Sequence, residues 1–143
     1  TERGYHVHFK DHDHLLSRPV IFLNKGFGIT PMEQGLRVVG TVEFGGLDAP
    51  ASKKRILNLV NNAKYLFPEL TKHYDEWLGF RPTLPDCLPV IGPSKNYKNL
   101  FYSFGHHHLG WTLGAISGKI VSNMIAEENT NLDLSAYNST RFS

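Results

Sequence analysis

The first 44 residues carry several short segments with the alternation or the composition of antiparallel strands. The segment YHVHF at 5–9 has period two, so Tyr5, Val7 and Phe9 share one face of a strand while His6 and His8 share the other. Three further segments, PVIFLN at 19–24, FGITPM at 27–32 and GLRVVGTVEF at 35–44, are rich in β-branched and aromatic residues and are punctuated by glycine and proline. The pattern predicts a run of antiparallel strands.

Two later segments have the three- and four-residue spacing of amphipathic helices. Between 51 and 67 the apolar positions include Ile56, Val60 and Ala63, Ser52 can cap the start, and Pro68 ends the pattern. A second helix is predicted to begin near Gly110, after a strand at 100–105, because the following segment carries an apolar stripe: Leu113, Ile116, Ile120, Met124 and Ile125. We expect a shorter helical turn over 70–77 and an irregular tail at the carboxyl end. The fold class is therefore α+β, with an antiparallel or mixed sheet and two main helices.

Composition narrows the possible classes of protein. With 143 residues, 41% of them hydrophobic and 20% charged, the chain can fold around one ordinary core, and we expect a single globular unit. A net charge of +2 is too small for a nucleic-acid-binding footprint, and no apolar run approaches the ~20 residues of a membrane span. The single cysteine, Cys87, makes no internal disulfide, which favours a reducing compartment. Because the chain opens at Thr1 without an initiator Met, we also expect a piece of a longer protein.

Two features could carry chemistry. Arg81 precedes Pro82, which favours extended backbone at Arg81, and a guanidinium offers a planar fork matched to a carboxylate. The alternative for Arg81 is a surface or structural ion pair. The glycine-rich turn from Gly105 to Thr112 precedes a predicted helix, whose first backbone amides could receive an anionic or electron-rich ligand edge. The alternative there is a tight turn that needs glycine for its backbone angles.

The eight histidines do not form a recognisable metal motif. His6 and His8 project together from a strand, but no cysteine pair, HExxH helix or compact carboxylate partner accompanies them, so no metal site is assigned. His6 and the run His106–His108 are interpreted as hydrogen-bonding, proton-handling or packing groups. GxSxG, P-loop and GxGxxG motifs are all absent, so any bound dinucleotide must be held by residues outside this sequence.

The order of several segments resembles a known family. These segments are ERGYHV at 2–7, ITPMEQGLRVVGTVEFGGLDAP at 29–50, LFPEL at 66–70, GFRPTLPDCLPVIGPS at 79–94, NLFYSFGHHHLGWTLG at 99–114 and RF at 141–142. They resemble the D-amino acid dehydrogenase branch of the flavin-dependent D-amino acid oxidase family, over nearly the whole chain.

The resemblance implies an FAD enzyme that oxidises D-amino acids to 2-oxo acids and ammonia by hydride transfer to flavin. Arg81 matches the arginine that grips the substrate carboxylate, and Tyr5 and His6 match a segment that lines the substrate side. The residues that match the flavin-facing turn and helix start are His108, Leu109, Gly110, Trp111 and Thr112. No catalytic base is assigned. The chain departs from many relatives at Cys87 and His107, where glycine is common.

The resemblance also implies a division of the chain and a missing half. Residues 1–78 would be the substrate-binding (cap) portion, and 79–143 the segment that returns to complete the FAD-binding domain. The FAD pyrophosphate would be held by an amino-terminal dinucleotide-binding half, without which the piece would be inactive. The other expected partners are a D-amino acid and a quinone or electron carrier, in the cytoplasm or peripherally at the cytoplasmic face of the inner membrane. Two alternatives stay open: a glycine, sarcosine or imino-acid oxidase of the same family, and a non-catalytic ligand- or metal-binding module.

Overall fold

A computed structural model describes residues 1–142. The chain forms two compact units. The first unit comprises residues 2–80, and the second comprises the residues from Arg81 onward together with Thr1. The expectation of a single globular unit is therefore wrong. The reason is that buried apolar side chains form one large core in the first unit, while a few others, Val90, Ile91 and Ile120, are buried separately in the second.

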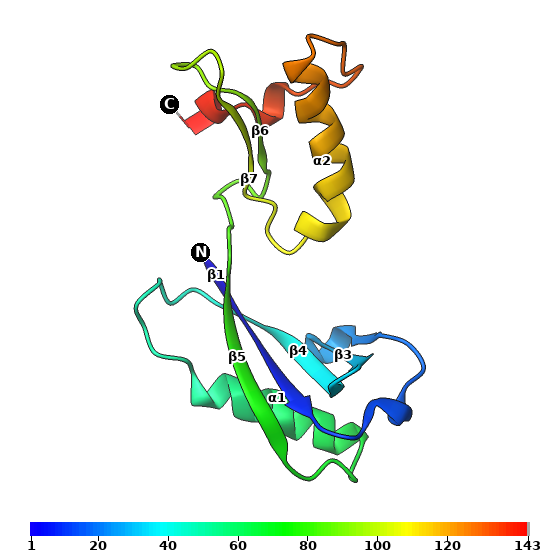
Figure 1. The fold of residues 1–143 in the computed structure, drawn as a ribbon. Coiled ribbons are helices and arrows are strands. Elements are labelled where there is room, and N and C mark those ends of the chain that lie inside the picture. The colour runs from blue at the N-terminus through cyan, green and yellow to red at the C-terminus, as the bar shows by residue number, and fades with distance from the viewer. Residues whose placement is uncertain (143) are drawn as a thin grey trace. The chain divides into compact units, whose positions relative to one another are not determined.

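The first unit is built on a five-stranded sheet of strand order β2-β3-β4-β1-β5 (Figure 1). Its strands are β1 (Glu2–Phe9), β2 (Val20–Phe22), β3 (Phe27–Met32), β4 (Gly35–Glu43) and β5 (His73–Arg81). The pairs β1 with β4, β4 with β3 and β3 with β2 are antiparallel. The predicted antiparallel strands are confirmed, although β2 is shorter than its apolar segment because a 3₁₀ turn, η2 (Leu23–Lys25), follows it.

Helix α1 (Lys53–Leu66) covers one face of this sheet, as its apolar spacing predicts (Figure 1). The core between helix and sheet takes alternate residues of β1 and the inward face of α1: Tyr5, Val7, Phe9, Ile56, Leu59, Val60 and Ala63. Since side chains alternate along a strand, His6 and His8 lie on the opposite face of the sheet. A further 3₁₀ turn, η1 (Asp13–Leu15), follows β1.

The predicted helical turn over 70–77 is wrong, because residues 73–81 form the edge strand β5. Leu70, Tyr74 and Trp77 have helix-like spacing, but Tyr74 and Trp77 are about half exposed, so the spacing does not mark a buried helical face. The segment is a strand because its backbone hydrogen-bonds to β1. The side-chain pattern of 70–77 does not reveal this pairing.

The second unit combines a two-stranded antiparallel sheet with one helix. Its elements are β6 (Val90–Pro93), β7 (Phe101–Phe104), α2 (Gly110–Ile125) and two 3₁₀ turns, η3 (Ser135–Tyr137) and η4 (Ser139–Phe142). The predicted strand at 100–105 and the helix near Gly110 are confirmed, whereas β6 was missed because prolines and glycine surround its short apolar run. The α+β class, with an antiparallel sheet and two main helices, is confirmed. Within residues 1–142 no helix has the length and apolar character needed to cross a membrane.

Candidate functional site

Arg81 stands where β5 ends, on a backbone that is fixed from two sides. Its carbonyl oxygen accepts hydrogen bonds from the Thr1 hydroxyl and from the Thr83 amide, both at 2.8 Å. Arg81 is half-buried, and Pro82 limits the backbone freedom on its carboxyl side. The Arg81 backbone therefore starts the side chain from a fixed point at the strand end, and its guanidinium is a planar fork of the kind that can pair with a carboxylate.

The turn before α2 requires glycine at Gly105. This residue has φ of +81°, and a Cβ placed on it would lie 2.5 Å from Cδ1 of Leu84. Both the backbone angle and the contact with Leu84 therefore disfavour a side chain here. His107 also has a positive φ, +53°, a backbone conformation that glycine adopts more readily than histidine. Cys87, the other departure, has φ of +61°.

The first turn of α2 lacks a side-chain cap. Leu109 occupies the cap position and contributes no side-chain hydrogen bond, so the amides at the start of the helix are not bonded to a capping side chain. A Cβ on Gly110 would make only an ordinary contact, 3.7 Å from Cβ of His106, and Trp111 is fully exposed. Uncapped amides and a small residue at one helix start fit a flat, electron-rich ring edge such as that of a flavin.

The histidine run in front of α2 contains one clear hydrogen-bonding group. His106 Nε2 lies 2.9 Å from the Ser117 hydroxyl, which is buried within the helix. This contact ties the loop to the third turn of α2 and fits a hydrogen-bonding role for His106, one of the three roles considered. Nε2 of His107 is buried and has no hydrogen-bond partner in the described residues.

Tyr5 and His6 lie on opposite faces of β1. The Tyr5 ring is in the core, 1% exposed, where its hydroxyl donates to Glu43 Oε2 at 2.5 Å and accepts from the Ser52 amide at 3.0 Å. His6 is half-buried on the other face and stacks on the Trp77 ring with centroids 4.9 Å apart. Burial, reinforced by the nearby cations, lowers the pKa of His6 and favours its neutral form. The two side chains therefore do not line the same surface.

A buried ionic group next to Tyr5 was missed by the sequence analysis. Arg3 is fully buried, pairs with Glu43 at 3.2 Å and donates to the carbonyl of Pro50 at 2.8 Å. A hydrogen bond from Tyr5, followed by the charges of Arg3 and Arg55, lowers the pKa of Glu43. The period-two pattern could have shown this, since Arg3 precedes Tyr5 by two positions and shares its inward face.

The expected site residues fall in both units. Arg81 and the segment His108–Thr112 belong to the second unit, whereas Tyr5 and His6 belong to the first. Among the described residues, one group of side chains has the composition and proximity of a metal site: His6, His8 and Asp75. Asp75 was not expected as their partner because residues 70–77 were predicted to be helical.

Comparison with known proteins identifies the family. The family model described as FAD dependent oxidoreductase, DAO, matches residues 1–124. A D-amino-acid oxidase of Bradyrhizobium diazoefficiens is 31% identical over 99% of this chain and 35% of its own length. A D-amino acid dehydrogenase of Granulibacter bethesdensis is 37% identical over 73% of this chain and 25% of its own length. The chain thus spans about a third or less of these relatives.

Solved structures agree with this assignment. Glycine oxidase from Geobacillus kaustophilus superposes with a TM-score of 0.84 at 27% identity, covering 98% of this chain and 38% of the oxidase. L-proline dehydrogenase from P. horikoshii, at 18% identity, shares the fold with a TM-score of 0.78 over 99% of this chain and 39% of its own. The resemblance in segment order and the match of the family model lead to the same conclusion: the chain belongs to the DAO family of FAD-dependent oxidoreductases.

Proposed function

We propose that this chain is the substrate-gripping and flavin-facing part of a D-amino acid dehydrogenase-like enzyme. In this proposal residues 1–78 form the cap portion, and residues 79–143 complete an FAD-binding domain whose dinucleotide-binding half lies outside the 143 residues. The names of the relatives, D-amino-acid oxidase and D-amino acid dehydrogenase at 31–38% identity, support this substrate class.

The observation that carries the proposal is the anchored position of Arg81. A substrate carboxylate needs a permanent cation that keeps one orientation, and the Arg81 backbone is held by two hydrogen bonds and by Pro82. A bidentate guanidinium–carboxylate pair would fix the amino acid by its carboxylate and so orient its α-hydrogen. Lysine could supply the charge but not the planar fork.

The start of α2 would meet the flavin. Bound FAD would supply the redox chemistry, as the acceptor of the hydride from the substrate α-carbon. The uncapped amides that begin at Gly110, with their neighbours from His108 to Thr112, would approach the ring edge and stabilise negative charge there. Gly105 and the His106–Ser117 bond would keep this helix start in place.

His6 would contribute a neutral imidazole to the substrate side of the cap. Its outward face and lowered pKa are compatible with a hydrogen-bonding role beside the amino acid. No general base is assigned, because a substrate whose amine enters neutral needs no proton removed before hydride leaves. The imino acid product then adds water and releases ammonia. Electrons would pass on to a quinone or carrier, with the complete enzyme in the cytoplasm or peripherally on the inner membrane.

A glycine-type oxidase of the same family is the second candidate. It is favoured by one observation, the TM-score of 0.84 with glycine oxidase. The two candidates differ in whether the substrate carries a side chain on its α-carbon. A panel of D-alanine, glycine and sarcosine separates them, and proline tests the imino-acid variant of the second candidate.

A chimera tests the proposal. The chain would replace its matching third of the Bradyrhizobium diazoefficiens D-amino-acid oxidase, which aligns with 99% of this chain. We expect a yellow, flavin-containing protein that reduces a dye when D-alanine is added. A control chimera carrying Arg81→Met should keep the flavin and lose activity at low substrate concentration. A folded yellow chimera that reduces dye with none of the panel amino acids would overturn the proposal.

A further inference from the structure

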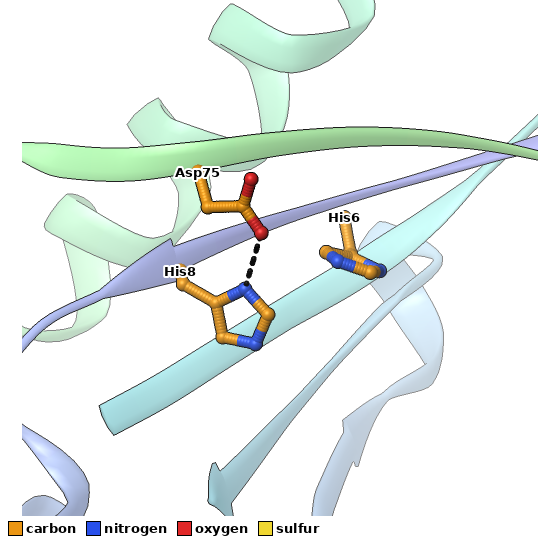
Figure 2. Close-up of side chains that lie close together, drawn as sticks. All are labelled: His6, His8 and Asp75. Atoms are coloured by element: carbon orange, nitrogen blue, oxygen red, sulfur yellow. Dashed lines mark hydrogen bonds and ion pairs between the residues drawn. The ribbon is translucent and has the colours of Figure 1, made fainter. Parts of the chain in front are cut away.

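Two histidines and one aspartate converge on the outer face of the first unit. His6 and His8 come from β1, and Asp75 comes from the neighbouring edge strand β5 (Figure 2). One ligand atom from each residue, an imidazole nitrogen or a carboxylate oxygen, lies within 4.8 Å of the other two. His6 and Asp75 are 69 residues apart in the sequence, and only the pairing of β5 beside β1 brings the group together.

We propose that His6, His8 and Asp75 form a binding site for a divalent transition-metal ion, with Zn²⁺ as its best-fitting occupant. Two imidazoles and a carboxylate are a ligand set that zinc accepts, and they would leave a fourth position for water or a ligand. With one carboxylate and two neutral imidazoles, the site would carry a net charge of about +1 when filled.

The geometry already matches one edge of such a site. His8 Nδ1 and Asp75 Oδ2 are 3.3 Å apart, a pair drawn as the dashed line in Figure 2. A charge-assisted hydrogen bond is usually about 2.7–2.9 Å long, whereas ligand atoms around tetrahedral zinc are separated by about 3.3 Å. The other two separations, both to His6, are at most 4.8 Å and would have to shorten when an ion binds. Asp75, whose side chain is about half exposed, has room to move toward the ion.

Neighbouring rings hold the two imidazoles in place. His6 lies flat on the Trp77 ring, with 13° between the planes, and meets the His8 ring nearly edge-on with centroids 4.9 Å apart. Rings that are ordered before the ion arrives lower the entropic cost of binding. Arg37 lies opposite His8 in β4, and its positive charge would repel the metal ion and limit the affinity of the site for it.

The test is a Zn²⁺ titration of the tag-free 143-residue chain, followed by calorimetry and by competition with a zinc-binding dye. We expect one ion per chain. Asp75→Asn, which keeps the side-chain shape, and His6→Phe, which keeps a ring against Trp77, should each weaken binding more than tenfold. When Co²⁺ replaces Zn²⁺, the wild type should show the visible absorption bands of a tetrahedral cobalt site. Both variants should lack these bands.

A matched control lies in the same unit. His12 and His14 are another histidine pair at positions i and i+2, with ring centroids 6.2 Å apart and without the Asp75 carboxylate. The double variant His12→Gln/His14→Gln should bind Zn²⁺ within twofold of wild type. The proposal is overturned if Asp75→Asn, folded by circular dichroism, binds as wild type does, if the His12/His14 variant loses the binding, or if no stoichiometric ion is bound.

The metal site shares His6 with the proposed substrate side of the cap, but its test does not depend on the flavin chemistry. All three ligands belong to residues 2–80, and the readouts are metal stoichiometry and absorption, with no activity involved. An inactive chimera would therefore leave the metal proposal intact, and a chain that binds no zinc would leave the role of Arg81 intact.

Discussion

Arg141 grips the carboxylate of Asp86 with two hydrogen bonds, although 55 residues separate them. Arg141 Nε donates to Oδ2 at 2.5 Å and Nη2 donates to Oδ1 at 3.2 Å, while Nη2 also reaches the carbonyl of Leu88 at 2.7 Å. This fork ties the carboxyl-terminal segment to the loop before β6. Arg141, in the RF segment at 141–142, is therefore anchored to the segment between Arg81 and β6.

Asp86→Asn should weaken the Arg141–Asp86 interaction. The stability of the second unit should then depend less on pH in the acidic range. The hydrogen bond from Arg141 is the main cause of the lowered pKa of Asp86. A carboxyl whose pKa is lower in the folded state stabilises the fold above its ordinary pKa of about 4, and this contribution is lost as the pH falls through the lower folded value.

The measurement is thermal unfolding of wild type and Asp86→Asn between pH 7 and pH 2. The wild type should melt at the higher temperature at pH 7, and the two curves should converge as the pH falls below 4. Glu127→Gln, an exposed change in the same unit, should melt like wild type at pH 7. Curves for Asp86→Asn and wild type that coincide at pH 7 would contradict the role of this pair.

Most of the fold could be predicted from periodicity, and the exceptions share a physical cause. The strands around Val7 and the helix through Val60 bury one face each, so their patterns report burial directly. The edge strand β5 buries little, and the short β6 lies among prolines and glycine, so backbone pairing rather than burial determines both.

The candidate site shows the same limit. Arg81 and the turn before Gly110 could be found because proline and glycine constrain the backbone locally. The convergence of Asp75 on His6 and His8 could not be found, since it depends on which strand pairs with β1. Tyr5 and His6 are adjacent in sequence, but a strand sends neighbouring side chains to opposite faces, so sequence proximity did not imply a shared surface.

Gly105→Ala should destabilise the second unit, and Gly118→Ala should not. Alanine at 105 meets both an unfavourable φ and the Leu84 side chain, which together should cost about 1–3 kcal/mol. At Gly118, within α2, a Cβ meets nothing within 4 Å, and alanine should stabilise the helix by up to ~1 kcal/mol. Urea unfolding of the 143-residue chain measures both changes. If both variants changed the free energy of unfolding equally, the turn would not need glycine at position 105.

Arg81→Lys should separate charge from geometry in the chimeric enzyme. Lysine keeps the cation but loses the planar fork, so we expect KM for D-alanine to rise about tenfold or more while flavin content stays unchanged. Arg18→Lys, in the exposed loop before β2, is the matched control and should leave KM within twofold. An unchanged KM for Arg81→Lys would mean that Arg81 does not hold the carboxylate.

Tyr5→Phe decides between a structural and a substrate-lining role for that residue. The Tyr5 hydroxyl joins three elements, since it lies on β1, donates to Glu43 at the end of β4 and accepts from Ser52 at the start of α1. Phenylalanine fills the same core space but leaves the Ser52 amide without this acceptor, which should cost about 1–3 kcal/mol.

The same change should raise the pKa of Glu43, because the Tyr5 hydrogen bond is the largest cause of its lowering. Acid unfolding of the variant should therefore begin at a higher pH than that of the wild type. Tyr65→Phe is the control: Tyr65 is 74% exposed on α1, so its loss of a hydroxyl should change stability by less than about 0.5 kcal/mol. Because the Tyr5 ring faces α1 rather than the His6 surface, KM of the chimera for D-alanine should not change. A raised KM with unaltered stability would instead place the Tyr5 hydroxyl beside the substrate.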